Sequence, residues 1–292
     1  MQKKRKVLVT GACGQLGSEI RRMTAGSGDF LFTDYLPAES ILPLDICDAE
    51  AVAACIADNR IGTIVNCAAY TNVEKAEDEP ELCRRINCDG VAVLADAALQ
   101  AGASLIQIST DFVFDGSKGS PYLETDSPAP LSVYGRSKAE SEFIFRTSGV
   151  SGIIIRTAWL YSPYGRNFLK TMLHLGATRE TITVVNDQAG SPTYAEDLAD
   201  VVLRLIPLAG KKKGEIYNYS NEGVCTWYDF SCEIMRQAGL DCKVIPVTSS
   251  EYPQKAVRPS YSYLDKSKIA AELGLDVPQW QVSLQKCLER LI

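Results

Sequence analysis

Histidine is almost absent from this chain of 292 residues, because His174 is its only one. Ser-His-Asp hydrolases and histidine-rich zinc sites both depend on imidazole groups, so the sequence excludes these two classes. Proton transfer in this protein must use another kind of side chain. We expect His174 to be an ordinary polar residue on a helix face.

Long apolar runs, paired cysteines and excess positive charge are also missing. No run approaches the roughly 18 apolar residues that a membrane-spanning helix requires, so we expect no membrane association. A net charge of −6 argues against nucleic acid as a partner. The ten cysteines include no Cys-x-x-Cys, and several lie in apolar runs. We therefore expect reduced, mostly buried thiols in a cytoplasmic protein.

The first half of the chain alternates short apolar or β-branched runs with helical patterns, which is typical of a doubly wound parallel sheet. The predicted strands are residues 7–10, 30–33, 63–67, 104–108 and 152–156, and the predicted helices are residues 15–25, 49–59, 81–101 and 134–147. Ligands of such sheets bind at the carboxyl ends of the strands. We expect one crevice to collect the residues that follow these strands.

A glycine-rich turn follows the first predicted strand. Gly11, Gly14 and Gly17 have the spacing Gly-x-x-Gly-x-x-Gly, and Gln15 and Leu16 open the next helix. Small residues let the backbone approach a diphosphate at a helix N-terminus, where free N–H groups favour negative charge. A plain turn can contain the same residues, but this position after the first strand favours a dinucleotide site for NADPH or NADH.

Asp34 ends the second predicted strand, where an acidic residue accepts hydrogen bonds from the adenosine ribose. The extra phosphate of NADPH would meet repulsion there unless a nearby basic residue offsets it, so the sequence leaves the choice of cofactor open. Asp45 and Ile46 are candidates for the adenine edge. Asp48 is the alternative explanation of this acidic cluster, as the N-cap of the following helix.

Tyr134 and Lys138 form a Tyr-x-x-x-Lys pair on the fourth predicted helix. Positions four apart share a helix face, so the ammonium can lower the pKa of the phenol. An isolated pair of this kind is more often a surface pair, but the glycine-rich turn favours the acid catalyst of a reductase. Thr110, in a Ser-Thr-Asp cluster after a predicted strand, is either a donor to the same carbonyl oxygen or a turn residue.

The rhythm becomes irregular after residue 156, where prolines and glycines separate shorter elements. We predict a dinucleotide-binding domain over residues 1–160, completed by segments that return within residues 181–220. A mainly substrate-binding lobe is predicted over residues 161–292. The candidates for returning strands are residues 181–185 and 215–219.

With these residues assembled, the chain resembles the extended short-chain dehydrogenase/reductase superfamily, and within it the dTDP-4-dehydrorhamnose reductase family. The resemblance is carried by residues 11–17, 66–77, 109–116 and 134–138, and more specifically by residues 156–161, 186–193 and 258–265. It implies a Rossmann-type fold with a smaller α/β substrate-binding lobe. It also implies reduction by NADPH or NADH of the C4 keto group of dTDP-4-dehydro-L-rhamnose to dTDP-L-rhamnose.

The resemblance further implies roles for individual residues. Tyr134 is the expected proton donor, with Lys138 and Thr110 as the other catalytic residues. The expected cofactor site consists of Gly11, Gly14, Gln15, Leu16, Gly17, Asp34, Asp45, Ile46, Ala68, Ala69, Tyr70, Thr71, Tyr134 and Lys138. The expected dTDP-sugar contacts are Val73, Thr110, Asp111 and Trp159. Arg258 is a candidate either for the substrate diphosphate or for a structural salt bridge.

One residue departs from the family pattern, and two glutamates bear on whether the protein forms a dimer. Phe112 stands where the family commonly has tyrosine, so a hydroxyl contact to the substrate is absent there. Glu19 and Glu196 match carboxylates that hold Mg²⁺ between the subunits of some relatives. We accordingly expect a monomer or a homodimer, with Mg²⁺ as the candidate ion of a dimer interface.

Three alternative functions are associated with similar sequences. A 4,6-dehydratase needs an Asp-Glu pair after the threonine, and Asp111-Phe112 lacks the second carboxylate. An epimerase uses the same tyrosine and lysine, so only the later segments argue against it. A regulatory subunit of methionine adenosyltransferase resembles the same family, and it would bind cofactor and a partner without sugar reduction.

Overall fold

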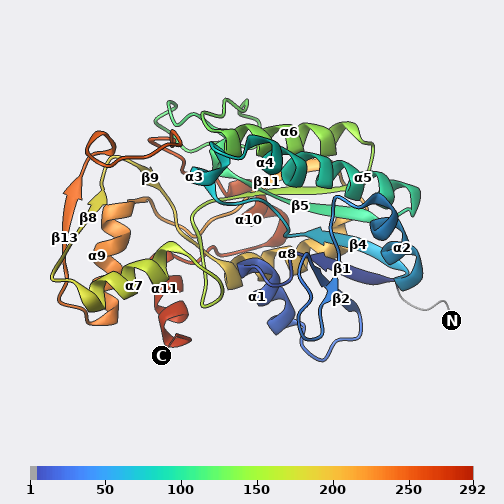
Figure 1. The fold of residues 1–292 in the computed structure, drawn as a ribbon, viewed down its shortest axis with the longest axis horizontal. Helices are drawn as coiled ribbons and strands as arrows, with labels where there is room; N and C mark the ends of the chain where they lie inside the picture. The colour runs from blue at the N-terminus through green and yellow to red at the C-terminus, as the bar shows by residue number, and fades with distance from the viewer. Residues whose placement is uncertain (1–4, 292) are drawn as a thin grey trace.

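The computed structural model describes residues 5–291, so residues 1–4 and 292, at the outer ends of the two predicted domains, lie outside it. Within the described range, seven parallel strands form one sheet in the order β11-β6-β5-β4-β1-β2-β3 (Figure 1). Their bounds are β1 Lys6–Thr10, β2 Phe30–Asp34, β3 Leu42–Pro43, β4 Ile61–Asn66, β5 Ser104–Thr110, β6 Gly152–Thr157 and β11 Lys213–Asn218. The predicted doubly wound sheet is confirmed.

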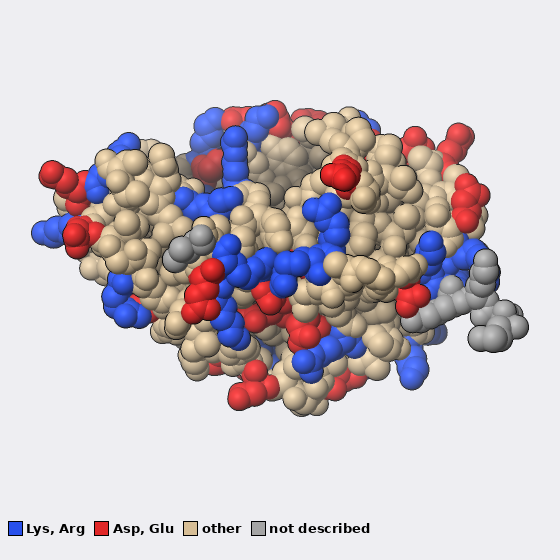
Figure 2. Space-filling model, turned by 90° about the horizontal axis from the view of Figure 1, so that it is seen from below, with Lys and Arg blue, Asp and Glu red and all other residues tan. Residues whose placement is uncertain are grey.

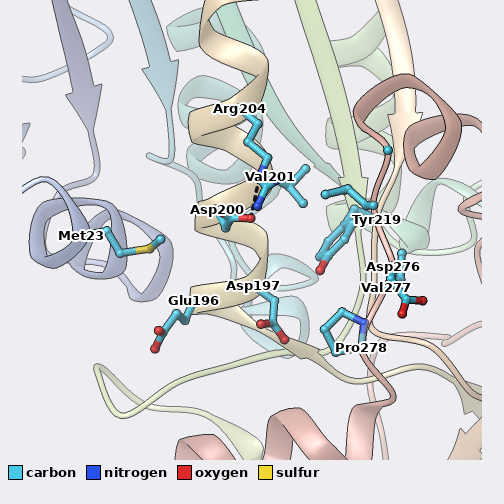
Figure 3. Close-up of a pocket in the computed structure, with 12 residues that line it drawn as sticks. Met23, Glu196, Asp197, Asp200, Val201, Arg204, Tyr219, Asp276, Val277 and Pro278 are labelled. Carbon is cyan, nitrogen blue, oxygen red and sulfur yellow. Dashed lines mark hydrogen bonds and ion pairs between the residues drawn. The ribbon is translucent and has the colours of Figure 1, made fainter.

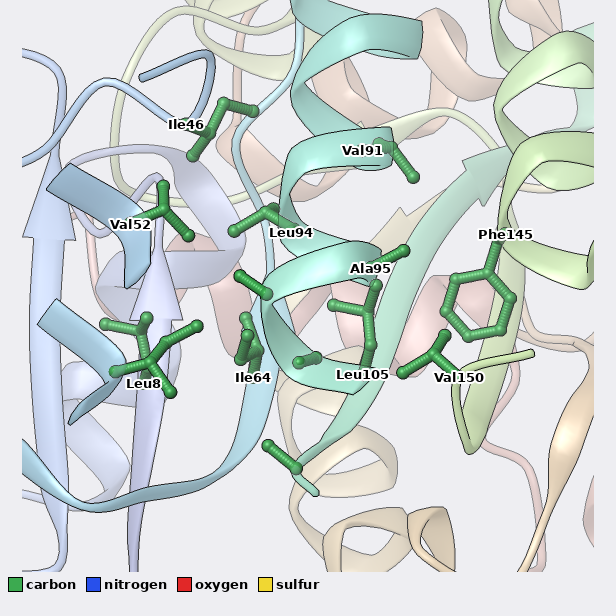
Figure 4. Packing of buried hydrophobic residues seen from close by; sticks show 14 of the residues in the cluster. Leu8, Ile46, Val52, Ile64, Val91, Leu94, Ala95, Leu105, Phe145 and Val150 are labelled. Atoms are coloured by element: carbon green, nitrogen blue, oxygen red, sulfur yellow. The ribbon is translucent and has the colours of Figure 1, made fainter. Parts of the chain in front are cut away.

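Alternation along the central strands gives the sheet two apolar faces, because successive side chains of a strand point in opposite directions. Leu8 and Ile64 belong to one buried cluster, whereas Val9 and Val65 belong to the other. The helices are α2 Ala49–Asn59, α5 Gly90–Gln100 and α6 Val133–Thr147 on the first face, and α1 Gln15–Met23 and α8 Ala195–Ala209 on the second. Figure 4 shows the first cluster packed between α5 and the strands.

The predicted helix over residues 81–101 is interrupted in the structure. It consists of α4 (Pro80–Arg84), one π-helical turn, η1 (Arg85–Asp89), and α5. Asn87 in this turn is buried; its Nδ2 donates to the Ser137 hydroxyl at 2.9 Å and to the Tyr70 carbonyl at 3.1 Å. A wider turn of this kind often marks a functional region. Here it ties α6 to the segment after β4.

The second half of the chain builds a smaller α/β lobe beside the sheet (Figure 1). The remaining elements are α3 Val73–Ala76, η2 Asp111–Val113, β7 Leu160–Tyr161, α7 Phe168–Thr178, β8 Thr181–Val185, β9 Ala189–Gly190, β10 Thr193–Tyr194, β12 Cys225–Thr226, α9 Trp227–Ala238, β13 Lys243–Val247, η3 Ser249–Glu251, α10 Ser267–Leu273 and α11 Trp280–Glu289. The lobe has its own core, formed mainly by α7, α9 and α11.

Only one of the two candidate returning strands joins the main sheet. β11 pairs with β6 at the edge of the sheet, as expected for residues 215–219. The expectation for residues 181–185 is wrong, because β8 pairs with β13 inside the smaller lobe. Alternation alone predicts a strand there, but the partner is set by an element about 60 residues later. The boundary between the two predicted domains stays a prediction.

The expectation of mostly buried thiols holds for only half of the cysteines, since five are buried, four are partly exposed and Cys13 is exposed. The ten cysteines, all within the described range, are free thiols. None of the helices in residues 5–291 is both long and apolar enough to cross a membrane. On the face drawn in Figure 2, basic and acidic side chains lie side by side.

Candidate active site

The glycine-rich turn joins β1 to α1 and is held against the end of β4. Gly11 has a φ of +63°, and a Cβ at this position would lie 2.6 Å from the backbone nitrogen of Ala68. The N-cap of α1 is Gly14, and no side chain caps this helix end. The Cys13 N–H is already used, since it donates to Asp34 Oδ2 at 2.8 Å. The turn therefore presents an uncapped helix N-terminus, which suits a phosphate group.

Helix α6 is brought close to the end of β5 by a serine cap and a glycine. The Ser132 hydroxyl accepts a hydrogen bond from the Gly135 N–H at 3.0 Å. A Cβ on Gly135 would lie 2.3 Å from the carbonyl oxygen of Phe112. Because the helix can approach so closely, Tyr134 reaches η2, and its ring packs edge-on against the Phe112 ring at 5.6 Å.

Tyr134 and Thr110 are both buried and line the same cleft. Burial raises the pKa of Tyr134 above its ordinary value, and the contact with Thr110 offsets part of this rise. Thr110 also contacts Asp111 Oδ1, with 3.0 Å between the oxygens. A buried phenol that keeps its proton is suited to donate it to a developing alkoxide.

Lys138 lies on the same helix, but it does not lower the pKa of Tyr134 as the sequence led us to expect. Its Nζ donates to the carbonyl oxygen of Ile108 at 2.6 Å, and its side chain is 3% exposed. Burial lowers the pKa of Lys138 to about 8, and the charge of Glu142 opposes this fall. The ammonium is therefore held next to the end of β5.

Asp111 is a buried carboxylate with one oxygen free. It is 1% exposed, and its Oδ2 has no hydrogen-bond partner among the described residues. Burial raises its pKa from 3.8 to about 6, although the nearby hydroxyls of Ser262 and Thr110 act in the opposite direction. Such an atom is unfavourable in the protein alone, because a buried acceptor without a donor loses its hydration. It is well suited to accept a hydrogen bond from a ligand hydroxyl.

These residues meet in one cleft of about 510 Å³. The predicted site residues that line it are Gly11, Gly14, Gln15, Leu16, Gly17, Ala68, Ala69, Thr71, Val73, Thr110, Asp111, Tyr134, Lys138, Trp159 and Arg258. The cleft runs from the turn of α1, past the ends of β4, β5 and β6, into the smaller lobe. Cofactor and substrate candidates thus share a single cavity, as expected for the carboxyl edge of a doubly wound sheet.

Four predicted cofactor residues lie outside the lining of this cleft. Asp34 holds the glycine-rich turn through Cys13, as described above. Asp45 accepts from the Cys47 N–H at 2.9 Å, and the Ile46 side chain is buried in the core. Tyr70 donates its hydroxyl to Glu79 Oε2 at 2.9 Å.

Asp48, the alternative explanation for the acidic cluster, does cap α2 by accepting from the Ala51 N–H at 3.0 Å. The cofactor roles of Asp34, Asp45, Ile46 and Tyr70 stay predictions.

The substrate end of the cleft contains a tryptophan stack. The Trp159 ring lies 3.6 Å from the Trp227 ring, with 10° between their planes. Trp159 also has a backbone φ of +46°, a left-handed conformation that residues other than glycine rarely adopt. A strained backbone of this kind persists only where the surroundings fix it, and such residues cluster at ligand sites.

Arg258 makes the predicted structural salt bridge and still faces the cleft. Its Nη2 contacts Glu74 Oε1 at 2.8 Å, while its Nε is buried without a partner among the described residues. The same arginine lines an adjoining cleft of about 690 Å³, together with Arg166, Phe168 and Trp227. Neither of the two alternatives for Arg258 excludes the other.

Several lining residues of the smaller lobe were missed from the sequence. Arg166, Asn167 and Trp227 line both clefts. A signal existed for two of them. Asn167 caps α7 by accepting from the Lys170 N–H, and Thr226 forms a capping box with Asp229, which starts α9 at Trp227. These caps predict helix starts, and helix starts commonly face ligands.

Glu19 and Glu196 do come together, but around arginines. Arg290 contacts Glu19 at 2.7 Å and Glu196 at 2.6 Å, and Arg22 contacts both carboxylates at 2.9 and 2.8 Å. Glu19 is fully buried, not exposed as the helical pattern suggested. Among residues 5–291, no cluster of acidic, cysteine or histidine side chains fits a metal ion. The donor set is already neutralised by two guanidinium groups, so the Mg²⁺ expectation finds no support.

A separate cleft of about 500 Å³ lies between α8 and residues 274–278 (Figure 3). Three of its carboxylates, Glu196, Asp197 and Asp200, have partners within the protein. Asp200 pairs with Arg204 at 2.7 Å, and Asp197 accepts from the Asn221 amide at 2.7 Å. No glycine-rich turn or Tyr-Lys pair lines it. The cleft that contains Tyr134 is therefore the candidate active site.

The chain is similar along nearly its whole length to known proteins. The family described as RmlD substrate binding domain matches residues 5–292. A dTDP-4-dehydrorhamnose reductase of Aggregatibacter actinomycetemcomitans is 38% identical over 290 residues, which cover 96% of this chain and 97% of the relative.

Two solved structures of the same enzyme name share the fold. The one from Clostridium acetobutylicum has a TM-score of 0.90 and 40% identity, covering 98% of this chain and 99% of that chain. The one from Bacillus anthracis, in complex with NADP, has a TM-score of 0.89 and 36% identity, covering 99% and 100%.

Proposed function

The chain belongs to the RmlD substrate binding domain family, and on this premise we propose that it is an NAD(P)H-dependent sugar-nucleotide reductase. The substrate is dTDP-4-dehydro-L-rhamnose, reduced at C4 to dTDP-L-rhamnose. One observation carries the proposal: Tyr134, Thr110 and Lys138 line the same cleft as the uncapped glycine-rich turn. The names of the relatives supply the sugar nucleotide.

The residues of the turn fit a dinucleotide. Gly11 and Gly17 leave space that a Cβ would fill, since a Cβ on Gly17 would lie 2.3 Å from the Gly11 carbonyl oxygen. The free N–H groups at the start of α1 would hold the diphosphate, because the helix dipole favours negative charge there. When bound, the dinucleotide supplies the hydride. Lys138, next to the end of β5, would hold its nicotinamide ribose.

Tyr134 carries the proton in this proposal. Its hydroxyl and that of Thr110 would both contact the C4 oxygen of the sugar, and Tyr134 would transfer its proton as that oxygen gains charge. Burial keeps the phenol protonated until then, because it disfavours the phenolate. The C4 carbon gains the hydride, the oxygen gains the phenolic proton, and the phenol is later reprotonated from solvent.

The smaller lobe would hold the rest of the substrate. Asp111 Oδ2, which lacks a donor, would accept a hydrogen bond from a hydroxyl of the deoxysugar. The N-terminus of α7 and the Arg258 guanidinium line the cleft and would bind the diphosphate, since both favour phosphate oxygens. The rings of Phe168 and Trp227, in the adjoining cleft, offer a surface on which the thymine can stack.

The test is reduction by the purified protein and by Tyr134→Phe, with enzymatically generated dTDP-4-dehydro-L-rhamnose. We expect NADPH or NADH oxidation, with dTDP-L-rhamnose identified by NMR. In Tyr134→Phe, turnover should fall by about 10²- to 10⁴-fold, the usual contribution of general acid catalysis, with little change in cofactor affinity. The phenylalanine ring preserves the contact with Phe112, so a melting temperature close to wild type is the matched control.

Other outcomes separate the alternatives. Cofactor binding without oxidation, together with tight binding of a methionine adenosyltransferase, would support a regulatory subunit. An isomerised ketosugar without net cofactor consumption would indicate an epimerase. Full turnover in Tyr134→Phe would reject Tyr134 as the proton donor while leaving the reductase assignment intact.

A further inference from the structure

A buried carboxylate stands one helical turn beyond Lys138, outside the cleft. Glu142 on α6 is 3% exposed. Its Oε1 accepts from the Ser109 hydroxyl at 2.6 Å and from Arg156 Nε at 2.9 Å, and its Oε2 accepts from Arg156 Nη2 at 2.7 Å. Positions four apart share a helix face, so Glu142 lies on the side of α6 that carries Lys138.

The two partners of Glu142 come from two strands that form the floor of the candidate site. Ser109 precedes Thr110 on β5, and Arg156, 1% exposed, precedes the last residue of β6. Arg156 also stacks over the Phe114 ring at 4.9 Å. Glu142 therefore fixes α6 to the ends of β5 and β6, next to the residues proposed to touch the substrate.

The surroundings of Lys138 contain one formal negative charge. The titratable groups that face it are Glu142 from α6, Cys83 from α4 and Cys88 from η1. Burial raises the pKa of both thiols, which keeps them neutral. β5 contributes the Ile108 carbonyl, and β6 contributes a second cation, Arg156, held by Glu142 itself.

We propose that Glu142 is a positioning residue that acts through Lys138: its buried charge, one helical turn away and fixed by Arg156 and Ser109, keeps Lys138 a cation. The inference rests on the proposed reductase function, in which Lys138 acts in the charged form. Arg156 cannot lose its proton under ordinary conditions, whereas a buried lysine can. If the carboxylate is removed, two buried cations remain, and Lys138 is the one that becomes neutral.

The test is Glu142→Gln, which keeps the shape of the side chain and removes its charge. The cationic form of Lys138 is present below its pKa and lost above it, so the alkaline limb of the kcat profile reports its titration. We expect this limb to move down by about one pH unit or more, so that activity at about pH 9 falls roughly tenfold beyond any loss at about pH 6.5.

A direct measurement of the ammonium does not depend on turnover. NMR titration of isotope-labelled lysine in the cofactor-free protein, with the Lys138 signal identified by its absence in Lys138→Arg, should show the same downward shift. Ser109→Ala removes a hydrogen bond but no charge and should leave the titration in place. The NMR titration tests the role of Glu142 separately from the proposed function. An inactive wild type would reject the reductase function but would leave the titration result unaffected.

Two results would overturn the inference. One is an unchanged Lys138 titration in folded Glu142→Gln, even if kcat falls, since that would make Glu142 purely structural. If Glu142→Gln does not fold, Glu142→Asp is the second variant. It can still pair with Arg156, but its shorter side chain moves the carboxylate away from Lys138 by the length of one methylene group. A smaller shift in the same direction then supports the inference, and no shift rejects it.

Discussion

Replacing Asp111 with asparagine should remove a fall in the free energy of unfolding that the wild type shows as pH rises. The pKa of Asp111 rises from 3.8 to about 6 on folding, mainly because the carboxylate is buried. The folded state therefore binds more protons than the unfolded state between these values, and the free energy of unfolding falls as pH rises through this window. A shift of about 2 units corresponds to roughly 3 kcal/mol.

Asp111→Asn cannot titrate, so its stability lacks this fall. We expect the free energy of unfolding of the variant, minus that of the wild type, to increase by about 2 kcal/mol between about pH 4.5 and about pH 7. Constant effects of the substitution, such as an unpaired amide, cancel in this comparison. Urea unfolding of both proteins at each pH measures the difference.

Asp115 provides the matched control, because its pKa is shifted the other way. Hydrogen bonds from the backbone and side chain of Ser117 lower the pKa of Asp115, and a further bond from Tyr122 acts in the same direction. Its charged form stabilises the fold, and that contribution is lost as pH falls. Asp115→Asn should therefore show almost no change in this difference between about pH 4.5 and about pH 7, and a change of opposite slope only below about pH 4. A flat difference for Asp111→Asn would refute the assignment of a destabilising buried carboxylate.

Three further predictions concern the cofactor turn, the substrate stack and the arginine cluster. Gly11→Ala should weaken NADPH binding at least tenfold by fluorescence titration and lower the melting temperature, because a Cβ would collide with the backbone of Cys67 and Ala68 after β4. Trp227→Ala should raise KM more than it lowers kcat, since it removes the ring against which Trp159 stacks. Arg290→Met should destabilise the protein by about 2 kcal/mol in urea unfolding, because buried Glu19 then keeps only Arg22 as an ion-pair partner. EDTA should leave the wild-type melting temperature unchanged.

The sheet half of the fold was predictable because its sequence repeats a local pattern. Each central strand is a run of β-branched residues that must be apolar on both faces, and each is followed by a helix with a 3.6-residue period. The positions of Gly11, Thr110 and Tyr134 then follow from topology, since residues after parallel strands meet at one edge. The cleft that joins them needed no long-range information beyond strand order.

The interrupted helix and the arginine cluster depend on partners that no local pattern reveals. Asn87 widens the turn between α4 and α5 while bonding to Tyr70 and Ser137, which are far from it in sequence. Glu19 resembles a solvated helical residue until Arg290, 271 positions later, is placed against it. In both cases the polar side chain is buried because a distant group satisfies it.

Phe112 shows how a departure from a family pattern can change meaning once the packing is known. From the sequence, it is only a lost hydroxyl contact. In the structure, its ring packs edge-on against Tyr134, and its carbonyl lies against Gly135 in the first turn of α6. The contact between the two rings needs no hydroxyl at position 112, so adding one can leave Tyr134 and Thr110 in place while changing the lining of the cleft. A tyrosine at position 112 should therefore alter substrate affinity more than turnover, which Phe112→Tyr kinetics can measure as a change in KM with kcat nearly constant.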